Sequence, residues 1–198
     1  MPAAYAALVD EELCNGDIVL IDRKSQGAVS AAITLGAKLR YGFASPHARY
    51  SHAAIVYDAT HPDAVVIVEA TAASGVQKAF LAKYHRSEFD VIPAKVEDDD
   101  WKQVKTFLEE VLNARTSYDY VTHVGLAVYA LTGTRVCVQR AGTAICSGLV
   151  CDALTRAGKI WARPPYACTP ADISHQLQPG GPVRSRHSGT FRRGRRRR

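Results

Sequence analysis

The sequence predicts an α+β fold in which a central antiparallel sheet packs against helices. Two β-rich apolar runs, 51–58 and 64–70, flank a short turn-rich connector of hairpin length. A third run, 89–94, alternates in polarity and contains Pro93, which favours an edge strand or a strand end. Apolar residues recur at helical spacing in 101–112 and 145–154, so two amphipathic helices are expected to cover this sheet.

The N-terminal part of the chain adds one strand and one helix. Residues 1–15 are expected to form a lead-in, after which Gly16-Asp17 opens the apolar run 18–22, typical of a buried strand. The Ala-rich segment 25–39 favours a helix, which its two glycines weaken. Gly, Ser and Pro in 41–50 predict a loop.

Shorter signals predict the remaining elements. An acidic run directly before Trp101 suits the first turn of a helix, because the helix dipole is positive there. Thr169 followed by Pro170 is typical of a capped helix start. The other expected elements are a short extended piece at Val76, a helical turn at 80–84, a helix from Ser117 to Leu131, and an extended segment at 161–166.

Length and charge predict one domain followed by a basic tail. With 198 residues, 47% of them hydrophobic, the chain can form one well-buried domain, which we place at 1–180. Residues 184–198 contain eight arginines and no acid, so the net charge of +6 leaves −2 for the preceding 183 residues. A nucleic-acid-binding surface on the domain is therefore not expected. The tail, 181–198, is expected to be disordered and to contact polyanions through Arg192–Arg198.

Cysteine usage and the N-terminus indicate the cellular setting. Five cysteines form an odd set without a CxxC pair, which favours a reducing compartment and predicts neither a metal site nor a cofactor. The first residues lack the pattern of a signal peptide, and the weakly polar run 121–131 is too short to span a bilayer. We therefore expect a soluble, cytoplasmic protein without a membrane span, unless it is delivered by a non-classical route or within a virion.

Cys146 is predicted to lie in the first turn of the helix formed by 144–154, which should end near Gly158 with a left-handed cap. Free backbone N–H groups and the positive end of the helix dipole favour a thiolate at that position. Free cysteines are also among the most buried residues, and a core position is the role expected for Cys151. This segment alone leaves both roles open for Cys146.

A histidine base and a carboxylate partner are expected on the predicted hairpin. His52 follows a loop and begins a buried strand, a common place for site residues, although a structural histidine is an equal alternative. Glu69 ends an apolar run, where a carboxylate must be exposed or paired. If paired position numbers sum to about 121, Glu69 lies directly opposite His52, with β-carbons about 5 Å apart. An even sum would separate the two side chains. The rival carboxylate, Asp58, lies about 20 Å along the strand.

Four short motifs in this order resemble one known family. They are Gly16-Asp17 before a strand, Tyr50-Ser51-His52-Ala-Ala-Ile-Val, Val68-Glu69-Ala70, and Ile145-Cys146-Ser147-Gly148-Leu149-Val150. Together they resemble the circularly permuted branch of the NlpC-type, papain-like cysteine peptidases, which includes YiiX-like enzymes and relatives of lecithin:retinol acyltransferase. The match spans roughly residues 16–158. YiiX-like members commonly have an acidic residue at the position of Gly148.

The resemblance implies a permuted papain-like fold and a catalytic triad. Cys146 would be the nucleophile and would face the substrate groove, His52 would be the general base, and Glu69 would orient it. The segment 117–120 resembles a Tyr-Asp segment that borders the substrate groove in such proteins. Substrate contacts are accordingly expected at Tyr118, Tyr120, Ser51 and Ser147.

The expected function is hydrolysis of an amide or peptide bond, for instance in a peptidoglycan-derived peptide, through a thioester on Cys146. A thioesterase or lipid acyltransferase would use the same triad and differ by a long apolar channel. A non-catalytic virion or delivery module, with a polyanion-binding arginine tail, is the third alternative.

Overall fold

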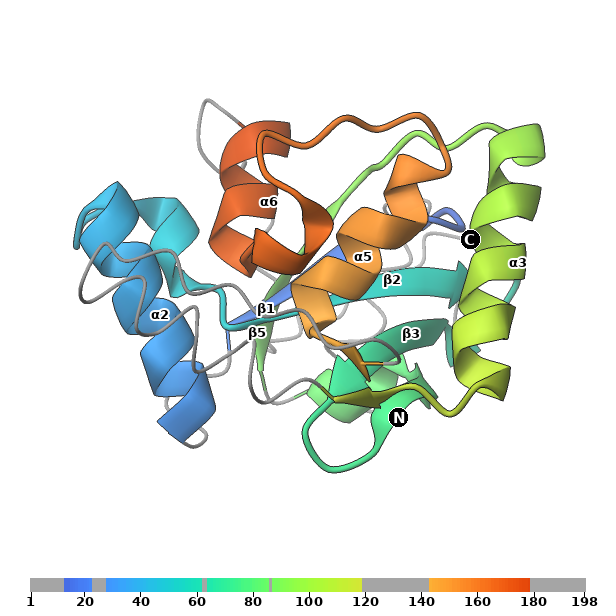
Figure 1. Cartoon of the computed structure of the whole chain (residues 1–198), viewed down its shortest axis with the longest axis horizontal. Coiled ribbons are helices and arrows are strands. Elements are labelled where there is room, and N and C mark those ends of the chain that lie inside the picture. Colours follow the sequence, from blue (N-terminus) through green and yellow to red (C-terminus); the bar gives the residue numbers. More distant parts are fainter. Residues whose placement is uncertain (1–12, 23–27, 62–63, 86, 119–142, 179–198) are drawn as a thin grey trace, which may run out of the picture.

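A five-stranded antiparallel sheet forms the centre of the computed structural model, which describes residues 13–22, 28–61, 64–85, 87–118 and 143–178 (Figure 1). The strand order is β4-β3-β2-β1-β5. The strands of this sheet are β1 (Ile18–Asp22), β2 (His52–Asp58), β3 (Val66–Thr71), β4 (Gly75–Phe80) and β5 (Glu88–Ile92). A separate two-stranded parallel sheet consists of β6 (Ser117–Tyr118) and β7 (Thr143–Ala144).

Helices complete the mixed α+β architecture that the sequence predicted. The α-helices are α2 (Ala28–Tyr41), α3 (Asp98–Asn113), α5 (Cys146–Thr155) and α6 (Pro170–Leu177). Three short 3-10 turns are η2 (Pro46–Arg49), η4 (Leu81–Tyr84) and η5 (Pro165–Ala167). Predictions for the lead-in at 1–12, for residues 119–131 and for the tail at 181–198 lie outside the described residues.

Strand β1 is buried on both faces, which explains its unbroken apolar run. It pairs with β2 on one side and with β5 on the other, and residues 18–21 are fully buried. The segment containing Pro93 follows β5, which forms the edge of the sheet as the proline indicated. The third predicted strand therefore joins the sheet through β1 and not through the hairpin.

Each face of the sheet has its own apolar core. Ala53, Ile55 and Val68 belong to the core that also contains the apolar side of α5, and Figure 1 shows this helix lying across β2. Ala54 and Ile67, on the alternate positions, belong to the opposite core. His52, the first residue of β2, has the same parity along the strand as Ala54.

The structure differs from the sequence-based expectation at four segments. Strand β4 has six residues, although only a short piece at Val76 was expected, because apolar and polar residues do not alternate regularly along it. Ser117 and Tyr118 form strand β6 and do not begin a helix. The segments 41–50 and 161–166, expected to be a loop and an extended stretch, contain the 3-10 turns η2 and the start of η5.

Both predicted helix caps are present. The helix α5 ends at Thr155, and Gly158 follows with a φ of +72°, while the N–H of Lys159 donates to Leu154 O at 3.1 Å. At the start of α6, Thr169 and Asp172 form a capping box. Asp172 therefore fixes the beginning of the last helix.

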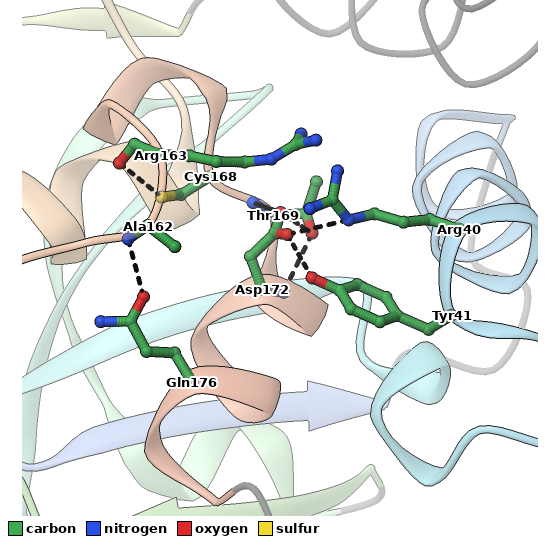
Figure 2. A network of polar contacts seen from close by, with 8 residues as sticks. All are labelled: Arg40, Tyr41, Ala162, Arg163, Cys168, Thr169, Asp172 and Gln176. Atoms are coloured by element: carbon green, nitrogen blue, oxygen red, sulfur yellow. Dashed lines mark hydrogen bonds and ion pairs between the residues drawn. The ribbon is translucent and has the colours of Figure 1, made fainter.

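Asp172 also links α6 to α2. Its carboxylate accepts a hydrogen bond from Tyr41 OH and lies 3.3 Å from Nε of Arg40, as Figure 2 shows. The Tyr41 ring stacks on His175, with centroids 5.0 Å apart. His47, in η2, is buried and its Nδ1 lies 2.9 Å from Ser174 Oγ. Helix α2 is thus held against the C-terminal helix by polar contacts and ring stacking.

Gly75 brings β4 into close contact with the segment that leads into β6. Its φ is +68°, and a β-carbon there would lie 2.4 Å from the carbonyl oxygen of Thr116. The next residue, Val76, donates its N–H to the same oxygen at 2.9 Å. This close approach seats β6 beside β4, and β6 in turn pairs with β7, which ends two residues before Cys146.

Replacing Gly75 with alanine is expected to destabilise the protein by about 2 kcal/mol more than the same change at Gly158. Both glycines have a similar positive φ, so both variants incur about 1 kcal/mol of backbone strain. A β-carbon at Gly158 meets nothing within 4 Å, whereas one at Gly75 collides with Thr116 O. Chemical unfolding of the two variants measures the difference, and equal losses would contradict the proposed junction.

Candidate active site

His52 and Glu69 are in direct contact at one end of the hairpin. Nε2 of His52 lies 2.8 Å from Oε2 of Glu69. The pairing register differs from the prediction, because Glu69 is opposite Ala54 and the paired numbers sum to 123. His52 and Glu69 are therefore diagonal neighbours on one face, and two long side chains can bridge that separation. The predicted face was correct, whereas the directly opposed register was wrong.

Glu69 is completely buried and has three further polar partners. Gln77, its neighbour on β4, donates from Nε2 to Oε1 at 3.1 Å. Lys83 forms an ion pair with Oε1, and Tyr84 OH donates to Oε2 at 2.5 Å. Burial alone would raise the pKa of this carboxyl, but His52, Lys83 and Tyr84 together hold the pKa far below its ordinary value. Glu69 is therefore an anion at neutral pH.

Sequence analysis did not identify Gln77, Lys83 or Tyr84 as site residues. Gln77 lies on the strand whose length was underestimated, and the other two lie in η4, directly after that strand. The usable signal was the buried carboxylate, because an ionised carboxylate accepts several hydrogen bonds and one histidine cannot satisfy it. That argument predicts further donors but does not identify them.

Cys146 is the first residue of α5, and it is 1% exposed. The residue before it, Ile145, is the N-cap of this helix and makes no side-chain cap. The hydroxyl of the next residue, Ser147, donates to Cys168 O at 2.7 Å. At this first helical position, Cys146 lies at the positive end of the helix dipole, which favours a thiolate.

Cys146 is also a hydrogen-bond partner of His52. Burial lowers the pKa of His52, but hydrogen bonding and charge attraction from Cys146 and Glu69 outweigh burial and raise the pKa to about 9. Because Nε2 faces Glu69, Nδ1 is the ring nitrogen that remains for the sulfur. The geometry thus favours an imidazolium between a thiolate and a carboxylate.

The two cysteines of α5 differ in their partners and not in their burial. Cys151 is fully buried in the core, as predicted, and its side chain contacts that of Cys168. Burial, followed by the contact with Cys168, raises the pKa of the Cys151 thiol, which favours the neutral form. Cys146 was expected to face a groove, but it is equally enclosed and is distinguished by its contact with His52.

The four predicted substrate contacts have different surroundings. Ser51 and Ser147 are buried beside His52 and Cys146, and the hydroxyl of Ser147 is bonded to Cys168 O. The backbone of Tyr118 pairs with Ala144 in β7, close to the start of α5. Tyr120 lies outside the described residues.

Gly148 leaves no room for a side chain. A β-carbon at this position would lie 2.9 Å from Cγ1 of Ile145 and 3.3 Å from the carbonyl oxygen of Pro165. The acidic residue common at this position in YiiX-like proteins would not fit here. Substrate specificity that depends on this acidic residue in YiiX-like proteins is therefore not expected for this chain.

The described residues contain no group of three or more His, Cys, Asp or Glu side chains arranged to hold a metal ion. Within the same part of the chain, no helix is both long and apolar enough to cross a membrane. Searches with family models and among curated proteins find no match to this chain. The resemblance to permuted NlpC-type peptidases therefore rests on the sequence motifs alone.

Removing the Cys146 sulfur is expected to lower the pKa of His52. In the wild-type protein, ring-nitrogen NMR should show His52 protonated up to about pH 9. In Cys146→Ala the thiolate is lost while burial remains, so the pKa should fall. Cys151→Ala is the matched control from the same helix and should leave His52 unchanged. An equal His52 pKa in all three proteins would contradict the proposed ion pair.

The same pKa shift predicts how stability depends on pH. The pKa of His52 is raised from 6.5 to about 9. Its contribution to the free energy of unfolding is therefore complete below pH 6.5 and is lost as the pH rises through 9. The pKa of Glu69 is lowered, so the stability that Glu69 contributes to the folded protein is present above pH 4.5 and is lost on acidification. The loss of thermal stability from pH 6.5 to 9.5 should be larger for the wild type than for Cys146→Ala.

Proposed function

We propose that this protein is a cysteine hydrolase that cleaves an amide or peptide bond through a triad of Cys146, His52 and Glu69. The observation that carries the proposal is the position of the His52 ring, which contacts Glu69 through Nε2 and also contacts Cys146. A nucleophile, a base and an orienting group in this order are what covalent acyl transfer requires. The position of Cys146 at a helix N-terminus supports the assignment.

The arrangement of the elements supports a permuted papain-like fold. The strand that begins with His52 precedes the helix that begins with Cys146, and this helix packs on the sheet containing that strand. The order His52, Glu69, Cys146 along the chain is the one found in the permuted branch of NlpC-type peptidases. The amide substrate class, including cell-wall peptides, follows from this resemblance.

The proposed reaction has two steps. The Cys146 thiolate attacks the carbonyl carbon, and the C–N bond breaks as imidazolium His52 gives its proton to the leaving amine. Water then attacks the thioester, His52 accepts a proton from this water, and the C–S bond breaks to release the acid and the thiolate. N–H groups at the start of α5 would stabilise the oxyanion in both steps.

Glu69 would keep the imidazole in one orientation throughout this cycle. Its partners Lys83 and Gln77 hold Oε1, while Tyr84 and His52 share Oε2. Because these contacts keep the carboxylate ionised, Glu69 stabilises the charged form of His52 and does not take its proton. Since Cys146 is 1% exposed, substrate reaches the sulfur only when the atoms that cover it are displaced.

Cys146→Ala should reduce amide hydrolysis by about 10³-fold or more, because the covalent route is lost. Turnover is measured by mass spectrometry on a panel of muropeptide fragments and acylated amino-acid amides. Cys151→Ala removes a buried thiol from the same helix and should retain turnover once its folding is verified. The proposal is wrong if Cys146→Ala, folded as judged by circular dichroism, hydrolyses the same substrates at the wild-type rate.

A further inference from the structure

Lys83 connects the surface of the protein with the buried candidate triad. Its side chain is 36% exposed, whereas the side chain of Glu69, with which it forms an ion pair, is completely buried. The ammonium group contacts Oε1 of this carboxylate, and Nε2 of His52 contacts Oε2. Glu69 therefore has Lys83 on one oxygen and His52 on the other.

The charges of the candidate triad do not cancel by themselves. A thiolate at Cys146, an imidazolium at His52 and a carboxylate at Glu69 give a net charge of −1 in a place where each residue is at most 4% exposed. A net charge without a counter-charge is costly in a protein interior, and burial then favours the neutral form of one of the groups. The ammonium group of Lys83 brings the net charge of the four side chains to zero.

The other partners of Glu69 cannot provide this charge. Gln77 and Tyr84 donate hydrogen bonds to the carboxylate, at 3.1 and 2.5 Å, but an amide and a phenol carry no positive charge. Tyr84 instead helps to place the lysine, because Nζ of Lys83 lies 5.0 Å from the centroid of the Tyr84 ring. Among the contacts of Glu69 in the described part of the chain, Lys83 is therefore the source of positive charge besides His52.

We propose that Lys83 is a positioning residue of the candidate active site and that its charge allows Cys146 and Glu69 to be ionised together beside one imidazolium. This role rests on the proposed hydrolase triad and adds the counter-charge that the triad needs. Without the ammonium group, His52 would face two anions, and one of them would take up a proton. A thiolate is more basic than a carboxylate, since the ordinary pKa of cysteine is about 8.5 and that of glutamate is about 4.3. Cys146 would therefore be the group that is protonated.

The ionisation of the Cys146 sulfur, followed by NMR of isotope-labelled cysteine β-carbons between pH 4 and 10, tests the proposal. The Cys146 signal is assigned by its absence from Cys146→Ala. In Lys83→Met and in Lys83→Gln the ammonium group is lost, so the titration midpoint of Cys146 should rise by about one pH unit or more. Lys83→Arg keeps the positive charge and should have a midpoint close to that of the wild type. Circular dichroism verifies that each variant is folded.

Lys78→Met is the matched control, because Lys78 lies on the preceding strand β4 and its Nζ is 3.8 Å from the centroid of the Tyr57 ring. This variant should titrate like the wild type. An unchanged Cys146 midpoint in Lys83→Met and Lys83→Gln would overturn the role of Lys83 and leave the proposed triad intact. So would an unchanged midpoint in Lys83→Gln alone, because hydrogen bonding and not charge would then hold Glu69. A wild-type midpoint near 8.5 would overturn both proposals, since Cys146 would be an ordinary thiol.

Discussion

The arrangement of the candidate site depends on one fully buried carboxylate. Glu69 is in contact with His52, Gln77, Lys83 and Tyr84, so two strands and one 3-10 turn besides its own strand converge on it. A buried ion pair is expensive to desolvate and adds little net stability compared with an apolar core. Its presence at the centre of a well-packed sheet therefore points to a role in controlling the charge of the histidine. The same contacts explain why Glu69 remains ionised although no part of it is exposed.

Contact with His52 distinguishes two cysteines that share one helix. Cys146 and Cys151 are both buried, and neither composition nor exposure separates them. Cys146 contacts a histidine whose pKa is raised, whereas the pKa of Cys151 is itself raised by burial and by Cys168. Helix α5 therefore has at its start the cysteine that we propose as the nucleophile, and further along a buried thiol whose raised pKa favours the neutral form.

Sequence patterns predicted the strands of the hairpin and the face that His52 and Glu69 share, because alternation of apolar residues determines which side of a sheet each residue faces. They did not predict the register, since a slip of two residues preserves every face. The pairing is irregular between Val56 and Asp58, and such a shift is set by the connection and not by polarity. Lys83 and Tyr84 were missed because tertiary packing alone brings η4 to Glu69. The cap at Gly158 was predictable, because it depends on local backbone geometry.

The proposed pairing of a Cys146 thiolate with protonated His52 can be tested by the pH profile of alkylation at Cys146. Peptide mass spectrometry after brief exposure to iodoacetamide gives the rate at Cys146 from pH 4 to 10, with the exposed Cys14 as an internal reference for the reagent. Burial of Cys146 lowers the alkylation rate at every pH. The change of this rate with pH is determined by the ionisation of the sulfur. The account predicts that the rate at Cys146 is already near its plateau at about pH 6. A rate that rises only around pH 8.5, as for an ordinary thiol, would contradict it.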